Sequence, residues 1–177
     1  MQMEEKLTYG LKKWEIAEAI FVACLGTLWH FVYEWSGKNF LVGLVAPVNE
    51  SVFEHFKLLI VPVFLFTLLE YKCLAGLRGC LFWRKWKSMM AGILFIVVFY
   101  YCYKGILQRE VAWLDIASFY GAAILNSLLA YRLLKKPCEG KGKELLGCLA
   151  WTVTIVLMIL GTLYPPLKVL PGLFISP

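Results

Sequence analysis

"VFEHFKLLIVPVFLFTLLEY", residues 52–71, begins with charged side chains and continues as a long apolar run. A helix needs about 20 mainly apolar residues to cross the hydrocarbon core of a bilayer. The run is too long for a strand, although Pro62 interrupts it near its middle. Residues 52–71 therefore predict a transmembrane helix that begins, unusually, with Glu54, His55 and Lys57.

The rest of the chain repeats this pattern. Further apolar runs of similar length occupy residues 14–35, 88–107, 111–131 and 145–164. The sequence is 60% hydrophobic and only 17% charged, whereas about a quarter of the residues in a soluble domain are charged. We therefore expect an all-α fold, a polytopic membrane bundle of five transmembrane helices that forms a single domain over residues 1–177.

Basic residues are concentrated at one end of this predicted bundle, which indicates its orientation. The N-terminal segment and the connections after the second and fourth helices hold most of them: Lys6, Lys12, Lys13, Lys72, Arg78, Arg84, Lys85, Lys87, Arg132, Lys135, Lys136, Lys141 and Lys143. The other end holds Lys38, Lys57, Lys104, Arg109 and Lys168. The positive-inside rule places the N-terminus in the cytoplasm and the C-terminus outside.

The lipid bilayer is the expected partner. A nucleic acid is not, since no basic face is interleaved with aromatic residues.

Ionisable side chains gather at the outer ends of three predicted helices. Such groups are costly within a membrane and usually face protein or a water-filled cavity, so they mark functional sites by default. His30 and Glu34 are one turn apart and share a helix face. Our candidates for ligand binding or acid/base chemistry are His30, Glu34, Asn49, Glu50, Glu54, His55 and Asp115.

Some of these side chains also have a structural explanation. Ser51-x-x-Glu54 matches the capping box of a helix N-terminus, and Lys57 can extend its ammonium to the headgroups. Asp115 begins a polar stripe that continues with Ser118, Ala122 and Asn126, a pattern also found where membrane helices pack together. Asp115 needs a partner, for which Lys104, Arg109 and His30 are available.

The chemistry of these residues suits several ligands. Histidine and carboxylate side chains bind zinc, manganese or iron, yet H-E-x-x-H is absent. A metal-free arrangement with histidine as general base fits equally well. Asn49, at a helix start, offers backbone N–H groups to an anionic headgroup. The sequence leaves the metal and any other cofactor undecided.

The six cysteines form no C-x-x-C pair. Cys73, Cys80 and Cys138 lie in loops expected to be cytoplasmic, where thiols stay reduced. We therefore interpret the cysteines as small apolar side chains that have neither a redox nor a metal-binding role.

"HFVYEWSG", residues 30–37, followed by "GLVAPVNESVFEHFKLLIVP", residues 43–62, resembles the signature of an uncharacterised family of small bacterial integral membrane proteins. In that family we expect tryptophan where this chain has Phe53. The resemblance implies the same fold and a bacterial inner (plasma) membrane location. It implies no activity.

Three classes of function fit the sequence. The favoured class is binding of a cation, a proton or a small polar ligand near the outer leaflet, for transport or sensing. An enzyme that acts on a lipid or headgroup and a partner subunit with a polar docking surface are the alternatives, so enzymatic activity stays undecided. An odd number of helices disfavours the common inverted-repeat transporters unless the protein forms a homodimer. The proline-rich end, residues 163–177, forms either a lid over the polar site or a frayed terminus.

Overall fold

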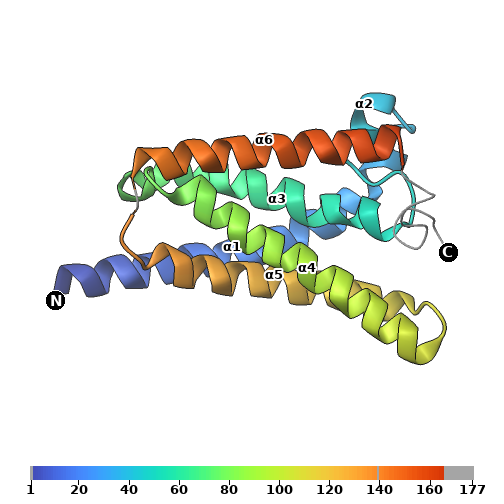
Figure 1. The fold of residues 1–177 in the computed structure, drawn as a ribbon, viewed down its shortest axis with the longest axis horizontal. Helices are drawn as coiled ribbons and strands as arrows, with labels where there is room; N and C mark the ends of the chain where they lie inside the picture. Colours follow the sequence, from blue (N-terminus) through green and yellow to red (C-terminus); the bar gives the residue numbers. More distant parts are fainter. Residues whose placement is uncertain (1, 139, 166–177) are drawn as a thin grey trace.

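The computed structural model describes residues 2–138 and 140–165 (Figure 1). Five helices in it are long and apolar enough to cross a membrane, which confirms the all-α prediction. The long helices are α1 (Gln2–Trp35), α3 (Val52–Cys73), α4 (Leu81–Leu107), α5 (Ala112–Leu134) and α6 (Lys141–Leu163). A short helix, α2 (Phe40–Gly43), follows α1, and a 3-10 turn, η1 (Ala75–Leu77), follows α3. Residues 166–177, most of the suggested lid, lie outside the described part.

Some helix boundaries differ from those expected from sequence. α4 begins at Leu81 instead of residue 88, because Arg84 and Lys85 are buried by protein contacts rather than left in a loop. α3 continues through Pro62 without a break. Neighbouring helices can compensate for the backbone hydrogen bond that proline removes in a membrane helix.

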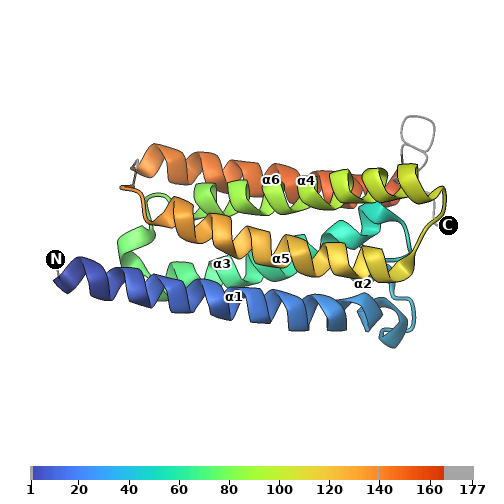
Figure 2. The ribbon, with the colours of Figure 1, turned by 90° about the horizontal axis from the view of Figure 1, so that it is seen from below.

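α3 is the central helix of the bundle. More than half of its most apolar stretch is buried (56%), against 17–28% in the other long helices. α1 packs against α3 and α5, while α4 packs against α3, α5 and α6 (Figures 1 and 2). Large apolar side chains such as Ile20, Leu94 and Leu145 point outward and are more than half exposed. Outward-facing apolar surface of this kind suits contact with lipid.

The two ends of the bundle differ in character. α2 and the loop that follows it lie at one end, which we call the α2 end (Figure 1). The N-terminal part of α1 and the connections α3–α4 and α5–α6 lie at the other. There, Cys80 and Cys138 form a disulfide with their Cα atoms 5.3 Å apart, so we call it the disulfide end. The expectation that all cysteines are separate thiols is wrong, because the fold brings these two loops together.

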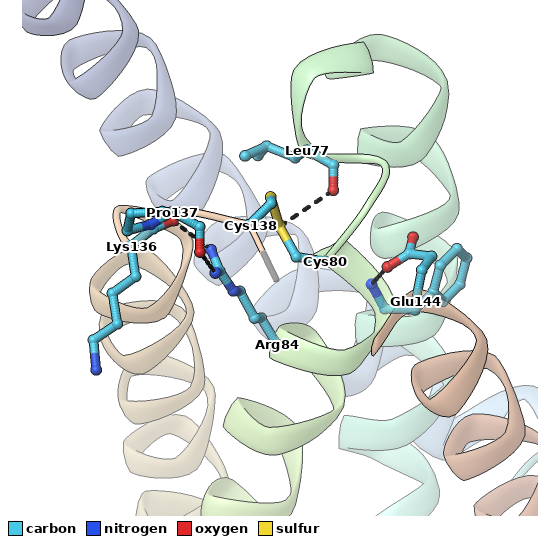
Figure 3. The surroundings of a disulfide bond; sticks show 8 residues. Leu77, Cys80, Arg84, Lys136, Pro137, Cys138 and Glu144 are labelled. Atoms are coloured by element: carbon cyan, nitrogen blue, oxygen red, sulfur yellow. Dashed lines mark hydrogen bonds between the residues drawn. A yellow bond between two sulfur atoms is a disulfide. The ribbon is translucent and has the colours of Figure 1, made fainter. Parts of the chain in front are cut away.

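Hydrogen bonds reinforce the disulfide end (Figure 3). The Arg84 guanidinium donates to the backbone carbonyl of Lys136 over 2.7 Å and also to that of Pro137. The Glu144 carboxylate accepts from the backbone N–H of Phe82 over 3.2 Å. The start of α4 is therefore tied to the α5–α6 connection and to the first turn of α6.

α6 and α4 approach very closely at Gly147. A Cβ atom built on Gly147 would lie 2.2 Å from the backbone nitrogen of Trp83. Small residues permit such close backbone approach between membrane helices. The Trp151 indole, one turn further along α6, donates to the Phe82 carbonyl over 3.1 Å. The glycine is therefore required by the packing of α6 on α4.

The orientation stays a prediction, and fusion reporters test it. A reporter active only in the cytoplasm should be active when inserted in the 135–143 loop and silent when fused after residue 177, because basic loops remain inside. Reporter activity only after residue 177, with the 135–143 fusion silent, would reverse the orientation.

Candidate functional site

Two helices and a loop bring His30, Glu50 and His55 together at the α2 end. His30 lies near the end of α1, His55 is in the first turn of α3, and Glu50 is in the loop just before α3. The two imidazole rings are stacked with their centroids 5.4 Å apart. One ligand atom from each of the three residues lies within 4.8 Å of the others. The structure therefore contains a His/Glu site.

The spacing within this site is wider than a hydrogen bond. His30 Nε2 is 3.5 Å from Glu50 Oε1, and His55 Nε2 is 3.4 Å from Glu50 Oε2. N–H···O bonds usually measure about 2.7–3.2 Å. With metal–ligand bonds of about 2.0–2.1 Å, two ligands of a tetrahedral zinc ion lie about 3.3–3.4 Å apart. The His30–Glu50 and His55–Glu50 distances are close to this spacing, and they involve different oxygens of Glu50.

A neighbouring backbone group orients His55. Its Nδ1 lies 2.8 Å from the carbonyl oxygen of Ser51. A carbonyl only accepts, so Nδ1 carries the proton and donates it to this bond. In the neutral imidazole Nε2 then has a free lone pair, and this atom faces Glu50. Metal-binding histidines are commonly fixed by the same kind of second hydrogen bond.

The three residues lie on the wall of a cavity of about 680 Å³. α4 and α5 form the opposite wall, and Asp115 at the start of α5 lines the same space. Asp115 is near enough to His55 for their charges to interact. Most of the remaining lining is apolar: Phe31, Val52, Leu58, Ile96, Ile116 and Phe119. The cavity thus combines a small polar site with room for an apolar group.

Asp115 and Glu110 are held by α4. The Tyr103 hydroxyl donates to Asp115 Oδ1 over 2.5 Å, so tyrosine is its partner rather than the basic residues expected from sequence. Glu110 accepts from the Tyr100 hydroxyl over 2.6 Å and from the Lys104 ammonium. Burial alone would raise the pKa of Glu110, but these two hydrogen bonds outweigh it and lower that pKa below its usual value. Glu110 is therefore a carboxylate at neutral pH.

Two sequence candidates lie away from the His/Glu site. Glu34 is exposed and pairs with Lys38 over 3.5 Å. Asn49 uses its side-chain oxygen to accept from the backbone N–H of Ser51 over 2.9 Å. These contacts are local, so Glu34 and Asn49 do not line the cavity with His30 and His55.

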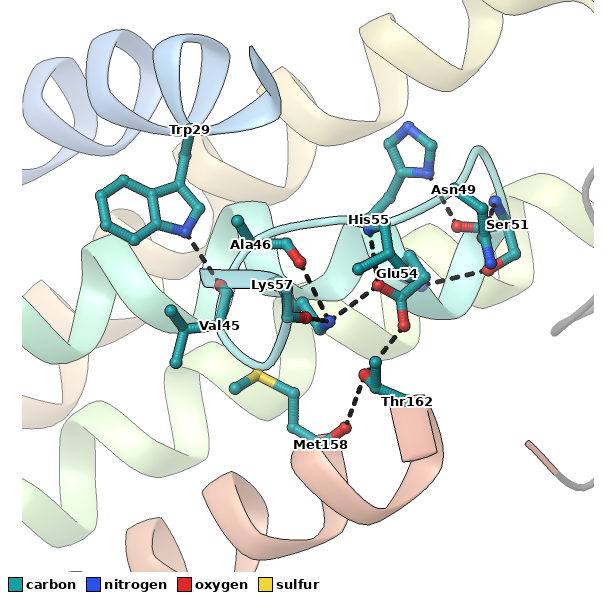
Figure 4. A network of polar contacts seen from close by, with 12 residues as sticks. Trp29, Val45, Ala46, Asn49, Ser51, Glu54, His55, Lys57, Met158 and Thr162 are labelled. Carbon is teal, nitrogen blue, oxygen red and sulfur yellow. Dashed lines mark hydrogen bonds and ion pairs between the residues drawn. The ribbon is translucent and has the colours of Figure 1, made fainter. Parts of the chain in front are cut away.

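Glu54 forms a separate buried network with Lys57 (Figure 4). Its Oε2 lies 2.7 Å from Lys57 Nζ, and its Oε1 accepts from the Thr162 hydroxyl on α6 over 2.9 Å. Lys57 also donates to the carbonyls of Gly43 and Ala46. Lys57 is fully buried, so it does not reach the headgroups as expected. The pair anchors the α2 loop to α3 and α6.

The capping expectation for Ser51 holds in part. The Ser51 hydroxyl accepts from the backbone N–H of Glu54 over 3.4 Å, as in a capping box. The reciprocal bond differs, because the Glu54 carboxylate accepts from Val48 N–H over 2.9 Å. Glu54 therefore fixes the loop as well as the helix start.

A second group of ionisable residues was missed by the sequence reasoning. Glu15 and Glu18 of α1, Glu70 of α3 and Lys85 of α4 meet near the disulfide end, and all four are buried. The signal was present, since the three glutamates fall within segments that we assigned to the membrane. These glutamates lie close to the ends of the predicted segments, where charged side chains are common and do not indicate a buried site.

The chain belongs to a family of unknown function (DUF6512), whose family model matches residues 3–174. The expected membership of an uncharacterised family is thus confirmed. No curated protein and no solved structure matches the chain.

Proposed function

We propose that this member of the DUF6512 family binds a divalent transition-metal ion through His30, Glu50 and His55, for transport or sensing of that cation at a membrane. The observation that carries the proposal is the spacing of the three ligand groups, which suits a small cation better than direct hydrogen bonds. Two imidazoles and a carboxylate are a donor set used for zinc, manganese and iron.

The surroundings of the three ligands support this proposal. Glu50 supplies one carboxyl group, and Asp115, which lines the same cavity, supplies a second. A cation can reach the site from the α2 end, since the Glu50 side chain is 64% exposed. We place the α2 end outside the cytoplasm, in the inner membrane of a bacterium, on the basis of the basic loops at the opposite end. The cation would then arrive from outside.

Metal binding can be measured on the purified full-length protein. Equilibrium dialysis against zinc should give about one ion per chain, and His30→Ala or His55→Ala should each weaken binding at least about 10-fold, because a lost ligand exceeds the effect of a lost second-shell partner. Occupancy should fall in acid, because the imidazoles must be neutral to bind. Glu34→Gln is the matched control on α1 and should leave binding unchanged.

Unchanged zinc affinity in both histidine variants, with their folding intact, would refute the metal site. The polar cluster would then be a hydrogen-bonded or docking surface. If Glu34→Gln weakens zinc binding as much as the histidine substitutions do, the ion binds elsewhere in the chain.

An enzyme that acts on a lipid or headgroup is the second candidate, and the cavity favours it. A catalytic zinc site commonly has three protein ligands and keeps one position open for water. The apolar wall formed by Leu58, Ile96 and Phe119 can take a lipid chain beside the metal. Proteoliposomes separate the two functions. Zinc uptake without altered lipids supports transport, whereas metal-dependent appearance of lipid products without uptake supports the enzyme.

A further inference from the structure

The buried group near the disulfide end carries more acid than base. Glu15, Glu18 and Glu70 supply three carboxyl groups, and Lys85 supplies one ammonium. The side chains of Glu18, Glu70 and Lys85 are 0% exposed, and that of Glu15 is 4% exposed. With all four ionised the group would hold an excess of two negative charges in a dry interior. Buried charge without a partner is very costly, and such groups are neutralised instead.

Lys85 is the centre of the group. Its ammonium lies 2.8 Å from Glu15 Oε1, 3.0 Å from Glu18 Oε2 and 2.8 Å from Glu70 Oε2. Its hydrogen bonds go to both oxygens of Glu15 and to Glu18 Oε2. One ammonium has a single charge, so it balances only one carboxylate. The Ser127 hydroxyl of α5 adds a hydrogen bond to Glu18 over 3.3 Å. This contact brings no charge, so the excess of acid remains.

Carboxyl oxygens of the group that lack a hydrogen-bond donor indicate what neutralises the excess negative charge. Among the described residues, no N–H or hydroxyl group donates to Oε1 of Glu18 or to either carboxyl oxygen of Glu70, and these atoms are buried. All three carboxyl groups contact the same ammonium, which holds them close to one another. Two carboxylates cannot hydrogen-bond to each other, but a carboxylic acid donates to a carboxylate. A proton on one carboxyl therefore supplies the missing donor.

We propose that Glu15, Glu18 and Glu70 form a proton-binding site that holds at least one exchangeable proton at neutral pH, with Lys85 fixing the three carboxyls around it. The site is separate from the His/Glu site, since Glu70 lies near the opposite end of α3 from His55, and it does not depend on metal binding there. Its helices are three of the four that surround the α2-end cavity. Proton uptake and release at this site can bias how α1, α3 and α4 pack.

Infrared spectroscopy tests the proposal directly on the intact protein. With ¹³C-labelled glutamate, the wild-type chain at neutral pH should show the C=O band of a glutamic acid, and this band should shift in D₂O. Glu15→Gln or Glu70→Gln should remove the band of a protonated glutamate or reduce it by at least half. Glu144→Gln is the matched control, since Glu144 is also buried but hydrogen-bonded to Phe82 N–H at the start of α4.

The wild-type spectrum alone can overturn the proposal, so it does not depend on the folding of the variants. Absence of any glutamic-acid band at neutral pH would show that the cluster holds no proton. A band that appears only when sodium is replaced by choline would show that a metal cation neutralises the cluster instead. A band that does not shift in D₂O would refute exchange, and one lost only in Glu144→Gln would place the proton outside the cluster.

Discussion

Replacing Lys85 with methionine should destabilise the protein by about 3–5 kcal/mol, the usual cost of removing one partner from a buried ion pair. Lys85 is fully buried and contacts Glu15, Glu18 and Glu70, each within 3.0 Å. Methionine fills a similar volume but leaves three carboxyl groups without an ammonium. Reversible unfolding in mixed micelles, followed by circular dichroism, measures the loss.

Lys104→Met is the matched control for that substitution. Lys104 also pairs with a glutamate, Glu110, but its side chain is 37% exposed. Pairs at this exposure contribute about 0–1 kcal/mol. The loss in Lys85→Met should lessen in acid, where the carboxyl groups take up protons. Equal stability of the two variants at neutral pH would mean that the buried cluster does not hold the fold together.

Replacing Gly147 with alanine should cost about 1–3 kcal/mol through overpacking. The new Cβ atom would lie 2.2 Å from the Trp83 nitrogen and 2.6 Å from the Phe82 carbonyl carbon. These are backbone atoms, so α6 itself must move away from α4. That movement also strains the bonds that Glu144 and Trp151 make with the backbone of Phe82.

Gly105→Ala separates this packing effect from helix propensity. Gly105 lies in α4 with nothing within 4 Å of its Cβ position, and alanine in a helix is favoured over glycine by about 0.5–1 kcal/mol. It should leave stability unchanged or raise it. The measurement is again unfolding in micelles. If both alanine variants behave alike, the close contact between α4 and α6 is not required for the fold.

The fold was predictable because a helix that crosses the hydrocarbon core of a bilayer must be long and mainly apolar. Long apolar runs bounded by charge indicated five helices, and residues 2–138 and 140–165 contain five such helices. The start of α4 was not predictable in the same way. Lys85 looks like a loop residue until α1 and α3 supply the carboxyl groups that neutralise it. A charge at a helix end cannot be assigned to solvent or to protein without its partners.

The candidate site was predictable at the level of residue type and depth but not of pairing. His30, Glu50 and His55 share a site, and Asp115 lines the same cavity, because helical periodicity and membrane depth both restrict where they lie. Glu54 is not part of the His/Glu site, because it forms an ion pair with Lys57 three residues later. The disulfide between Cys80 and Cys138 depends on two loops 58 residues apart in sequence. Such long-range pairing leaves no local sequence signal.

X-ray absorption of the zinc-loaded protein tests the metal site most directly, because it counts and identifies the ligands. We expect two imidazole nitrogens at about 2.0–2.1 Å and oxygen ligands completing the shell, with no sulfur. His55→Ala should remove one imidazole from the spectrum, and Glu34→Gln should leave it unchanged. A spectrum with sulfur ligands, or one without imidazole in the wild-type protein, would contradict a metal site at His30, Glu50 and His55.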